Sequence, residues 1–291
     1  MRYDQIKSMR SFYPVVLMCR TLEVSESGFH AWAIRPLSAR KLENARLQVE
    51  VLAAHQRTRE TYGAERLHSD LADHGVHITP YRVRMLRKKL NLRCKQKRKF
   101  KITTNSNHKF PVANNILARA FAVGAPNRAW VSDITYISTD EGWLYLAGIK
   151  DLYSGELVGY AMNERMTQSL VAQALFRAVA NKRPAKGLVL HSDRGSQYCA
   201  HDYQKLLRQF GMTVSMSRKG DCWDNAPMES FWGTLKNELV CHEKFATRQR
   251  AIQEITEYVE VFYNRQRKQA RLGYLSPATF TQQYYKKLLA A

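Results

Sequence analysis

The 291-residue sequence predicts an α/β domain with a mixed five-stranded sheet, preceded by an all-helical region. Before about residue 93, apolar residues recur at helical spacing, whereas from about residue 121 runs of β-branched and aromatic residues appear. In this second part the expected elements follow in the order β-β-β-α-β-α-β-α, which is typical of a sheet with helices on its faces. We expect three segments, at residues 1–44, 45–105 and 121–285.

Residues 1–44 are expected to form short helices. Pro14 precedes an apolar-rich turn, the Ser25–Gly28 stretch interrupts it, and Pro36 ends the segment. A longer helix is predicted from Lys41 to Arg57. Its apolar positions recur at helical spacing: Leu42, Ala45, Val49 and Leu52.

Residues 62–92 have the pattern of a helix-turn-helix. A first helix from Ala64 to His74 ends at Gly75, and Thr79 followed by Pro80 begins the second. The basic side chains of the second helix face outward and are the predicted DNA contacts: Arg82, Arg84, Arg87, Lys88 and Lys89. The alternative is an ordinary helical hairpin with a solvated basic face.

Positive charge dominates the composition, with a formal net charge of +21. Residues 1–120 carry 24 basic and 9 acidic side chains, and residues 82–101 carry eleven basic side chains and no acidic one. The stretch from Arg93 to Lys101 is expected to link two domains and to lie along a phosphate backbone, with a plain charged linker as the rival. A polyanionic partner is expected because each neutralised phosphate releases condensed counterions.

Other compositional features exclude whole classes of protein. A hydrophobic content of 45% argues against disorder, and the longest uncharged apolar runs are too short to span a bilayer. Five scattered cysteines argue against a disulfide framework and a cysteine zinc site. The start of the chain leads into no signal-type apolar stretch, so we expect a cytoplasmic protein.

Five strands and the helices between them are predicted from residue 129 onward. The expected strands are 129–137, 143–149, 157–162, 188–190 and 213–216, and the expected helices include 168–182 and 203–210.

Three acidic residues occupy special places in this layout. Asp133 lies within the first strand, where a buried carboxylate is costly unless a cation or hydrogen bonds compensate it. Asp193 directly follows an apolar strand, and Glu229 opens a helix. Such a set, without paired histidines, suits Mg²⁺ or Mn²⁺, and two such ions can drive an in-line displacement at phosphate. The alternative for each residue alone is an ordinary surface charge.

Three blocks of sequence carry a resemblance to a known family. They are Trp130–Ile137, His191–Tyr198 and Ser217–Lys236, and thirty-five residues separate Asp193 from Glu229. The blocks resemble the DDE transposases related to retroviral integrases. More narrowly, they are similar to the second-reading-frame (OrfB) proteins of the "IS three" family of bacterial insertion sequences. The resemblance covers nearly the whole chain.

The resemblance implies a ribonuclease-H-like integrase core that holds two Mg²⁺ or Mn²⁺ ions. It implies strand cleavage and strand transfer at the ends of a mobile element, with Asp133, Asp193 and Glu229 as the catalytic triad and Lys236 as a contact to terminal DNA. It also implies double-stranded element ends and target DNA as substrates, a homo-oligomer on DNA, and a nucleoid-associated location in a bacterium. In this family an upstream frame (OrfA) is usually fused to the catalytic frame by frameshifting.

Two rival functions belong beside this one. A catalytically inactive DNA-binding regulator is disfavoured by the intact triad, whereas a nuclease that hydrolyses without joining uses the same kind of metal site.

Further residues near the triad have both structural and functional interpretations. Trp232 is an expected DNA contact through stacking on a base, with Phe231 in the core. Asp151 lies on a predicted strand, and structuring the adjacent turn is favoured for it over a role as a fourth acidic ligand. Loop or cap roles are favoured over metal binding for Asp221 and Asp224, and a buried structural role is favoured over proton transfer for His191. Arg194 either holds a phosphate or pairs with a core carboxylate.

Overall fold

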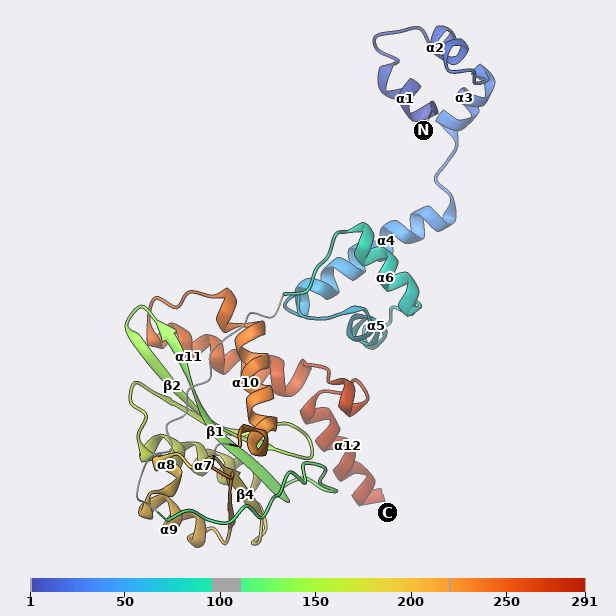
Figure 1. Ribbon diagram of the computed structural model, residues 1–291. Coiled ribbons are helices and arrows are strands. Elements are labelled where there is room, and N and C mark those ends of the chain that lie inside the picture. Colours follow the sequence, from blue (N-terminus) through green and yellow to red (C-terminus); the bar gives the residue numbers. More distant parts are fainter. Residues whose placement is uncertain (1, 96–110, 220, 291) are drawn as a thin grey trace.

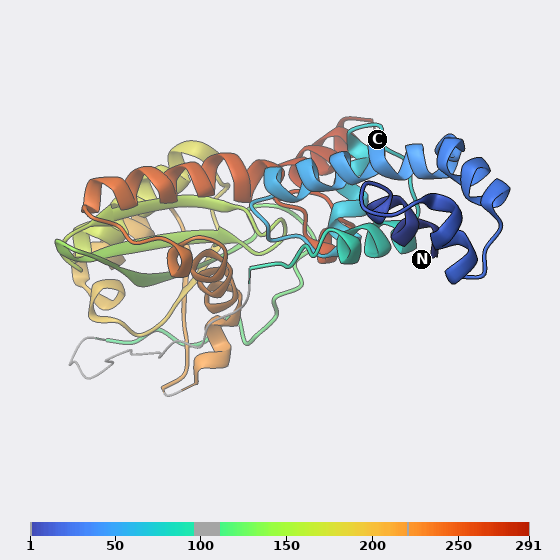
Figure 2. The ribbon, with the colours of Figure 1, turned by 90° about the horizontal axis from the view of Figure 1, so that it is seen from above.

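The computed structural model describes residues 2–95, 111–219 and 221–290, in which three parts follow one another (Figure 1). A unit of three short helices comes first, a second helical unit follows, and a sheet covered by helices makes up the rest. Seen from above, the first unit and the sheet lie at opposite ends of the molecule (Figure 2). The predicted α/β domain and the all-helical region before it are confirmed. No helix within the described ranges has the length and apolar character needed to cross a membrane.

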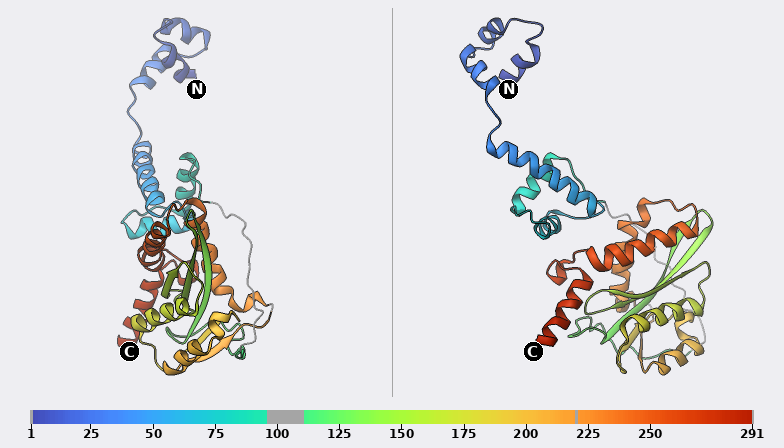
Figure 3. Two further views of the ribbon diagram at one scale, coloured as in Figure 1. Left: turned by 90° about the vertical axis from the view of Figure 1, so that its left-hand side faces the viewer. Right: turned by 180° about the vertical axis from the view of Figure 1, so that it is seen from behind.

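The first unit consists of α1 (Arg2–Met9), α2 (Val15–Thr21) and α3 (Glu26–Ile34). Its small core is formed by Ile6, Cys19 and Phe29. The predicted interruption at Ser25–Gly28 is a helix start, because the Ser25 hydroxyl accepts a hydrogen bond from the Gly28 amide at 3.1 Å and caps α3. An extended stretch then leads to α4, and both views in Figure 3 show this unit standing away from the sheet.

The second unit contains α4 (Ala39–Arg57), α5 (Ala64–Asp73) and α6 (Pro80–Lys89), so the two predicted helices of the helix-turn-helix are confirmed. Gly75 takes a positive φ of 77° directly after α5, a conformation that costs glycine little. Thr79 caps α6 by accepting a hydrogen bond from the Arg82 amide. Of the predicted basic linker from Arg93 to Lys101, only residues 93–95 lie among the described residues.

Helix α4 differs from the prediction in which side it buries. It runs without a break across the domain boundary predicted between residues 44 and 45. The four apolar positions that predict it are all exposed: Leu42, Ala45, Val49 and Leu52. Its buried residues are instead Leu47, Val51 and Ala54, because α5 and α6 pack on that side. The helix has two apolar stripes, and periodicity alone does not say which one faces the core.

The sheet has five strands in the order β3-β2-β1-β4-β5. Their bounds are β1 (Ala129–Thr139), β2 (Gly142–Asp151), β3 (Leu157–Asn163), β4 (Val189–Ser192) and β5 (Thr213–Met216). The first three strands are antiparallel, whereas β4 and β5 run parallel to β1, so the predicted mixed sheet is confirmed. In the β1–β4 ladder Ser132 lies opposite Ser192. The next residues of the two strands, Asp133 and Asp193, therefore leave the ladder beside each other.

Helices pack on both faces of the sheet because side chains alternate along each strand. Trp130 joins the cluster formed with α7 (Gln168–Lys182), α8 (Ser196–Cys199) and α9 (His201–Gln209). Val131 joins the other cluster, to which α10 (Ala226–Glu238) and α11 (Arg248–Glu257) contribute. The chain after β5 forms η1 (Cys222–Asn225), α10 (Ala226–Glu238), η2 (Val240–His242), α11 (Arg248–Glu257), the π-helix η3 (Tyr258–Gln266), η4 (Ala270–Leu272) and α12 (Pro277–Ala290).

The helix-turn-helix unit is docked on the sheet domain through Tyr62. Its buried hydroxyl donates to the Gln266 carbonyl at 3.3 Å and accepts from the Lys268 amide at 2.6 Å. An ion pair between Arg59 and Glu257 lies at the same contact. The apolar side chains of the two parts form one continuous cluster, so α6 and the sheet are held in a defined relation.

Candidate active site

Asp133 is the most constrained of the three predicted carboxylates. It lies on β1 opposite Gly148 of β2, and its Oδ2 accepts a hydrogen bond from the indole Nε1 of Trp232 at 3.0 Å. Burial, followed by repulsion from the Asp193 carboxylate, raises the pKa of Asp133 to about 8. A carboxylate in this position is ionised at neutral pH only when a positive charge compensates it.

Asp193 sits in a tight turn directly after β4. Its Oδ1 accepts a hydrogen bond from the Gly195 amide at 2.9 Å, and a side chain at Gly195 would bring its Cβ to 3.0 Å from that same oxygen. The turn therefore holds the Asp193 carboxylate close to its own backbone, at the end of β4 that faces Asp133. The sequence prediction that these two residues come together is consistent with the repulsion between their charges.

Glu229 comes from the first turn of α10, where a proline occupies an early position that needs no amide hydrogen. The start of this helix is tied to β1, because Asn225 Nδ2 donates to the Ser132 carbonyl at 3.1 Å. Glu229 is half-buried, and burial raises its pKa, while its charge adds to the repulsion at Asp133. The three acidic residues thus share one electrostatic environment.

The donor chemistry of this site consists of carboxylate oxygens. Within the described ranges, no three His, Cys, Asp or Glu side chains are gathered closely enough to form a metal site by themselves. The mutual repulsion of Asp133, Asp193 and Glu229 nevertheless fits a hard cation, which prefers oxygen ligands and removes the cost of placing like charges together.

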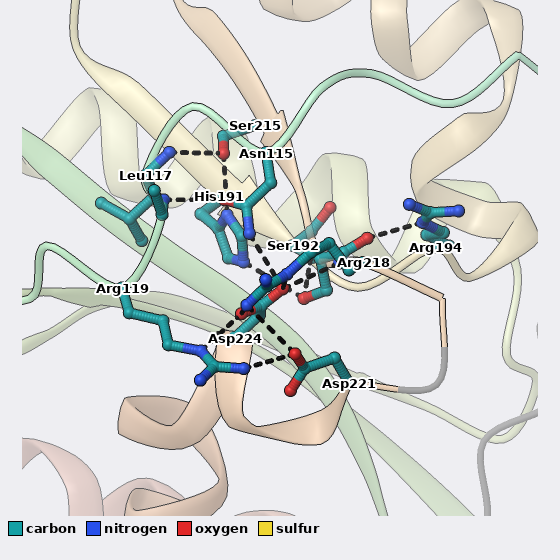
Figure 4. A network of polar contacts seen from close by, with 12 residues as sticks. Asn115, Leu117, Arg119, His191, Ser192, Arg194, Ser215, Arg218, Asp221 and Asp224 are labelled. Atoms are coloured by element: carbon teal, nitrogen blue, oxygen red, sulfur yellow. Dashed lines mark hydrogen bonds and ion pairs between the residues drawn. The ribbon is translucent and has the colours of Figure 1, made fainter.

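The loop before α10 is ordered by a different acidic residue, Asp224, whose carboxylate is fully buried (Figure 4). The carboxylate accepts five hydrogen bonds at 2.8–3.0 Å. Its Oδ1 accepts from Arg119 Nε and Arg218 Nη2. Its Oδ2 accepts from Asn115 Nδ2 and from the backbone amide and Nε of Arg218. Hydrogen bonds from Arg218 hold the pKa of Asp224 well below its usual range. Asp221 joins the network through ion pairs with the same two arginines. These contacts support the loop role favoured for Asp221 and Asp224.

Three other candidates near the triad also have structural contacts. His191 is fully buried between the hydroxyls of Ser215 and Ser217, at 2.9 and 3.1 Å, and burial lowers its pKa to about 4. Arg194 Nε donates to the Ser217 carbonyl at 2.5 Å. Asp151 accepts hydrogen bonds from the Ser154 amide and hydroxyl, which supports its predicted place in a turn.

Trp232 lies in the core and not on the surface. Its side chain is 5% exposed, and Phe231 packs beside it with 5.0 Å between ring centroids. A DNA base could stack on Trp232 only if the ring left this position, so the placement does not favour the expected base contact. Phe231 is buried, as predicted.

Lys236 is half-buried on α10, with its Nζ 5.0 Å from the centre of the Tyr136 ring. Burial lowers its pKa, and Asp133 is one of the groups that oppose this shift. The charges of Lys236 and Asp133 therefore interact, and the predicted contact of Lys236 with terminal DNA stays a prediction.

The basic residues predicted to contact DNA lie along α6 but differ in exposure. Arg84, Lys88 and Lys89 are exposed, and Arg84 pairs with Glu65 across the helix-turn-helix. Arg82 is half-buried and bonds to Glu43 and Asn44 of α4, while Arg87 donates to Cys94 Sγ. The exposed members form the outer face of the unit, whereas the half-buried ones also hold its helices together.

Two residues of the site were missed by sequence reasoning. Lys150 is buried on β2, and its Nζ donates to the Pro227 carbonyl at 3.0 Å, beside the start of the Glu229 helix. Burial lowers the pKa of Lys150 to about 7. A lysine inside the apolar run of β2 was the available signal. For Asn225 the sequence offered no signal of its contact with β1.

Comparison with known proteins gives matches along most of the chain. Residues 124–222 and 229–285 match models described as integrase core domain, and residues 41–100 match a model described as HTH-like domain. The chain is 56% identical to an insertion element IS600 uncharacterized 31 kDa protein of Shigella sonnei, over 92% of this chain and 99% of that protein. It is 38% identical to the transposase InsF for insertion sequence IS3A of Escherichia coli (strain K12), over 96% and 98% of the two chains.

Among solved structures, the chain is similar to the HTLV-2 integrase catalytic core domain in complex with magnesium. The TM-score is 0.43 at 16% sequence identity, and the match covers 54% of this chain and 97% of that one.

Proposed function

The chain belongs to the insertion-sequence transposases with an integrase core, and we propose that Asp133, Asp193 and Glu229 are its catalytic carboxylates. Its function is DNA strand cleavage and strand transfer at the ends of a mobile element, with the ribonuclease-H-like fold of that core. The observation that carries the assignment of the triad is Asp133, a strand carboxylate whose pKa is raised by burial and by Asp193. Such a group is stable as an anion only with a cation beside it.

The triad would hold two divalent ions, Mg²⁺ or Mn²⁺, through its carboxylate oxygens, with DNA phosphate completing the coordination. When bound, such a pair activates an attacking water or 3′-hydroxyl and stabilises the leaving oxygen. Asp133 must be ionised to bind a cation, so metal binding is coupled to its raised pKa. Lys236 would orient the phosphate backbone beside them.

The helix-turn-helix implies DNA binding by a part of the chain separate from the triad. We propose that the exposed face of α6, with Arg84, Lys88 and Lys89, contacts phosphate groups and sets the register of the duplex. Because the unit is docked on the sheet domain through Tyr62, DNA held by α6 takes a defined direction relative to the triad. We also propose that two copies of the chain bind the two ends of the element. Each copy would be fused to the product of an upstream frame (OrfA).

The two rivals predict different products. An inactive regulator would bind DNA without cutting it, and the near-complete match to transposases with the triad intact does not favour it. A nuclease would cut the element end but never join it to a target.

The experiment uses a labelled duplex carrying the element end, unlabelled target DNA and the full chain. Cleaved and joined products are expected with Mg²⁺ or Mn²⁺, but not with EDTA or with Ca²⁺, which binds oxygen ligands in a looser geometry. Asp133→Asn, Asp193→Asn and Glu229→Gln should each abolish both products while bulk DNA binding is retained, since the three residues act as one unit.

The matched control is Asp140→Asn, a half-exposed carboxylate that follows β1 and pairs with the exposed Lys244. It should cut and join normally. Near-normal joining by any triad variant would remove that residue from the site, and cleavage without joining by the wild-type chain would identify the nuclease.

A further inference from the structure

Beyond the triad, we propose that Trp232 positions the Asp133 carboxylate and, through it, the Glu229 helix. This proposal rests on the assignment of Asp133 and Glu229 to the catalytic site. The indole nitrogen is a donor only and carries a single hydrogen. It donates this hydrogen to Asp133 Oδ2, at 3.0 Å. One oxygen of the carboxylate is thereby held in place, and the side chain cannot turn freely.

The indole reaches Asp133 because β2 has a glycine at the position directly opposite. In the β1–β2 register Asp133 faces Gly148. A Cβ at Gly148 would lie 2.8 Å from Trp232 Cη2 and 3.3 Å from Met228 Cε. The first distance is too short for two carbon atoms, so a side chain here would displace the ring or the helix that bears it. The missing side chain at Gly148 therefore leaves the space that the indole ring occupies.

The same contact also determines where Glu229 lies. Trp232 follows Glu229 by three residues, about one turn of α10. The start of α10 is already tied to β1 by the bond from Asn225 to the Ser132 carbonyl. The helix is thus fastened on both sides of Glu229 to two consecutive residues of β1, Ser132 and Asp133. Two carboxylates from distant parts of the sequence are brought into register by these bonds.

A positioning role differs measurably from simple core packing. Trp232→Phe keeps an aromatic ring beside Phe231 but removes the N–H group. If Trp232 positions Asp133, cleavage and joining should fall by about 10–100-fold, and the Mg²⁺ concentration for half-maximal rate should rise, as for other residues that orient metal ligands. The concentration of terminal DNA needed for half-maximal rate should change less than the Mg²⁺ concentration, because α6, the proposed contact with the duplex, is untouched.

Gly148→Ala provides a second perturbation, which retains Trp232 and its N–H group. The added methyl group displaces the indole ring from the space beside residue 148, so this variant should show the same rise in Mg²⁺ requirement as Trp232→Phe. The matched control is Trp143→Phe, since Trp143 is 50% exposed and lies on the same β1–β2 hairpin. It should leave both the rate and the Mg²⁺ dependence unchanged.

A spectroscopic measurement tests the contact without catalysis. The chain has five tryptophans, so 5-fluorotryptophan labelling yields five ¹⁹F signals, and the one lost in Trp232→Phe belongs to Trp232. This signal should move in Asp133→Asn and on addition of Mg²⁺ with terminal DNA, whereas the Trp143 signal should not follow the metal.

The proposal is overturned if Trp232→Phe folds and keeps the wild-type rate and Mg²⁺ dependence, or if its signal ignores Asp133→Asn. An unfolded Trp232→Phe shifts the decision to Gly148→Ala, and an unchanged Mg²⁺ requirement in a folded Gly148→Ala then overturns the proposal. The outcome is separable from that for the triad. An inactive Asp133→Asn beside a fully active Trp232→Phe would refute only the positioning role, whereas an active Asp133→Asn would refute the triad.

Discussion

The ion pair between Glu238 and Arg267 offers the sharpest prediction about stability. Glu238 lies at the end of α10, and Arg267 follows the π-helix, so the pair joins the helix that carries Glu229 to the carboxyl-terminal part of the chain. Their side chains are only 11% and 9% exposed. Arg267 Nη2 and Nε bond to Glu238 Oε1 and Oε2 at 2.7 and 2.8 Å, and the Tyr258 hydroxyl donates to Oε2 at 2.8 Å.

Glu238→Gln keeps the size of the side chain and removes its charge. Both carboxylate oxygens accept from Arg267, so either orientation of the new amide places an NH₂ group against the guanidinium. Two unit charges about 4 Å apart attract by about 4 kcal/mol at an effective dielectric constant of 20. Because both groups are buried, solvent screens the pair little, and the uncompensated Arg267 remains. We expect a loss of about 3–5 kcal/mol, a large part of the usual 5–15 kcal/mol of unfolding free energy.

The assay is urea unfolding of the full chain, followed by the fluorescence of the buried Trp130 and Trp232. The pair between the exposed Arg250 and the partly exposed Glu254 on α11 is the matched control, and Glu254→Gln should cost at most about 1 kcal/mol. The double variant Glu238→Leu with Arg267→Met should recover most of the loss, because a buried pair replaced by apolar groups is often neutral. A loss below about 1 kcal/mol in Glu238→Gln would refute the reasoning.

Three further predictions concern single sites. Lys236→Ala should weaken binding to terminal DNA and lower joining while the Mg²⁺ dependence is preserved, with Lys236→Arg milder; unchanged end affinity would make it an ordinary helix lysine. Gly159→Ala should lower the unfolding free energy by about 1–3 kcal/mol, because the added Cβ would clash with the Ala174 carbonyl oxygen. The control is Gly63→Ala, whose Cβ would meet nothing within 4 Å and which should cause no such loss. Asp224 has a lowered native pKa, so its stabilisation is complete above the unfolded pKa of about 3.9 and is lost as pH falls below it. Asp224→Asn should therefore flatten the fall of unfolding free energy between about pH 5 and 3, and an unchanged slope would contradict this assignment.

The elements themselves were largely predictable from local sequence. Thr79, Pro80 and Gly75 are start and stop signals that act within a few residues, and the helices of the helix-turn-helix begin and end where these signals place them. The strands were predictable because β-branched and aromatic residues favour pleated, buried positions. The buried face of α4 was not, since which of its two apolar stripes packs inward depends on α5 and α6.

The proposed triad was chosen from the sequence because Asp133, Asp193 and Glu229 lie in long blocks that resemble a known family. The contacts around it could not be predicted in this way. Trp232 was expected to stack on a base because its side chain is aromatic. Only its position over Gly148 shows why it is buried. That contact joins residues 84 positions apart, a relation that neither periodicity nor propensity contains.

The proposed active site and α6, the proposed DNA-reading helix, are linked through the same side of the sheet. Phe231 of α10 packs on Tyr263 of the π-helix with 4.7 Å between ring centroids, and the Tyr62 hydroxyl bonds to the carbonyl of Gln266 at the end of that helix. Buried contacts thus connect the helix-turn-helix unit to the helix that carries Glu229. Because close-packed interiors transmit displacements, a change that loosens Tyr62 should alter where DNA lies relative to the triad before it alters the triad itself. Tyr62→Phe removes both hydrogen bonds but keeps the ring, and it should shift the position of cleavage on an element end while general nuclease activity persists. Cleavage at unchanged positions would show that the DNA-reading unit needs no fixed relation to the site.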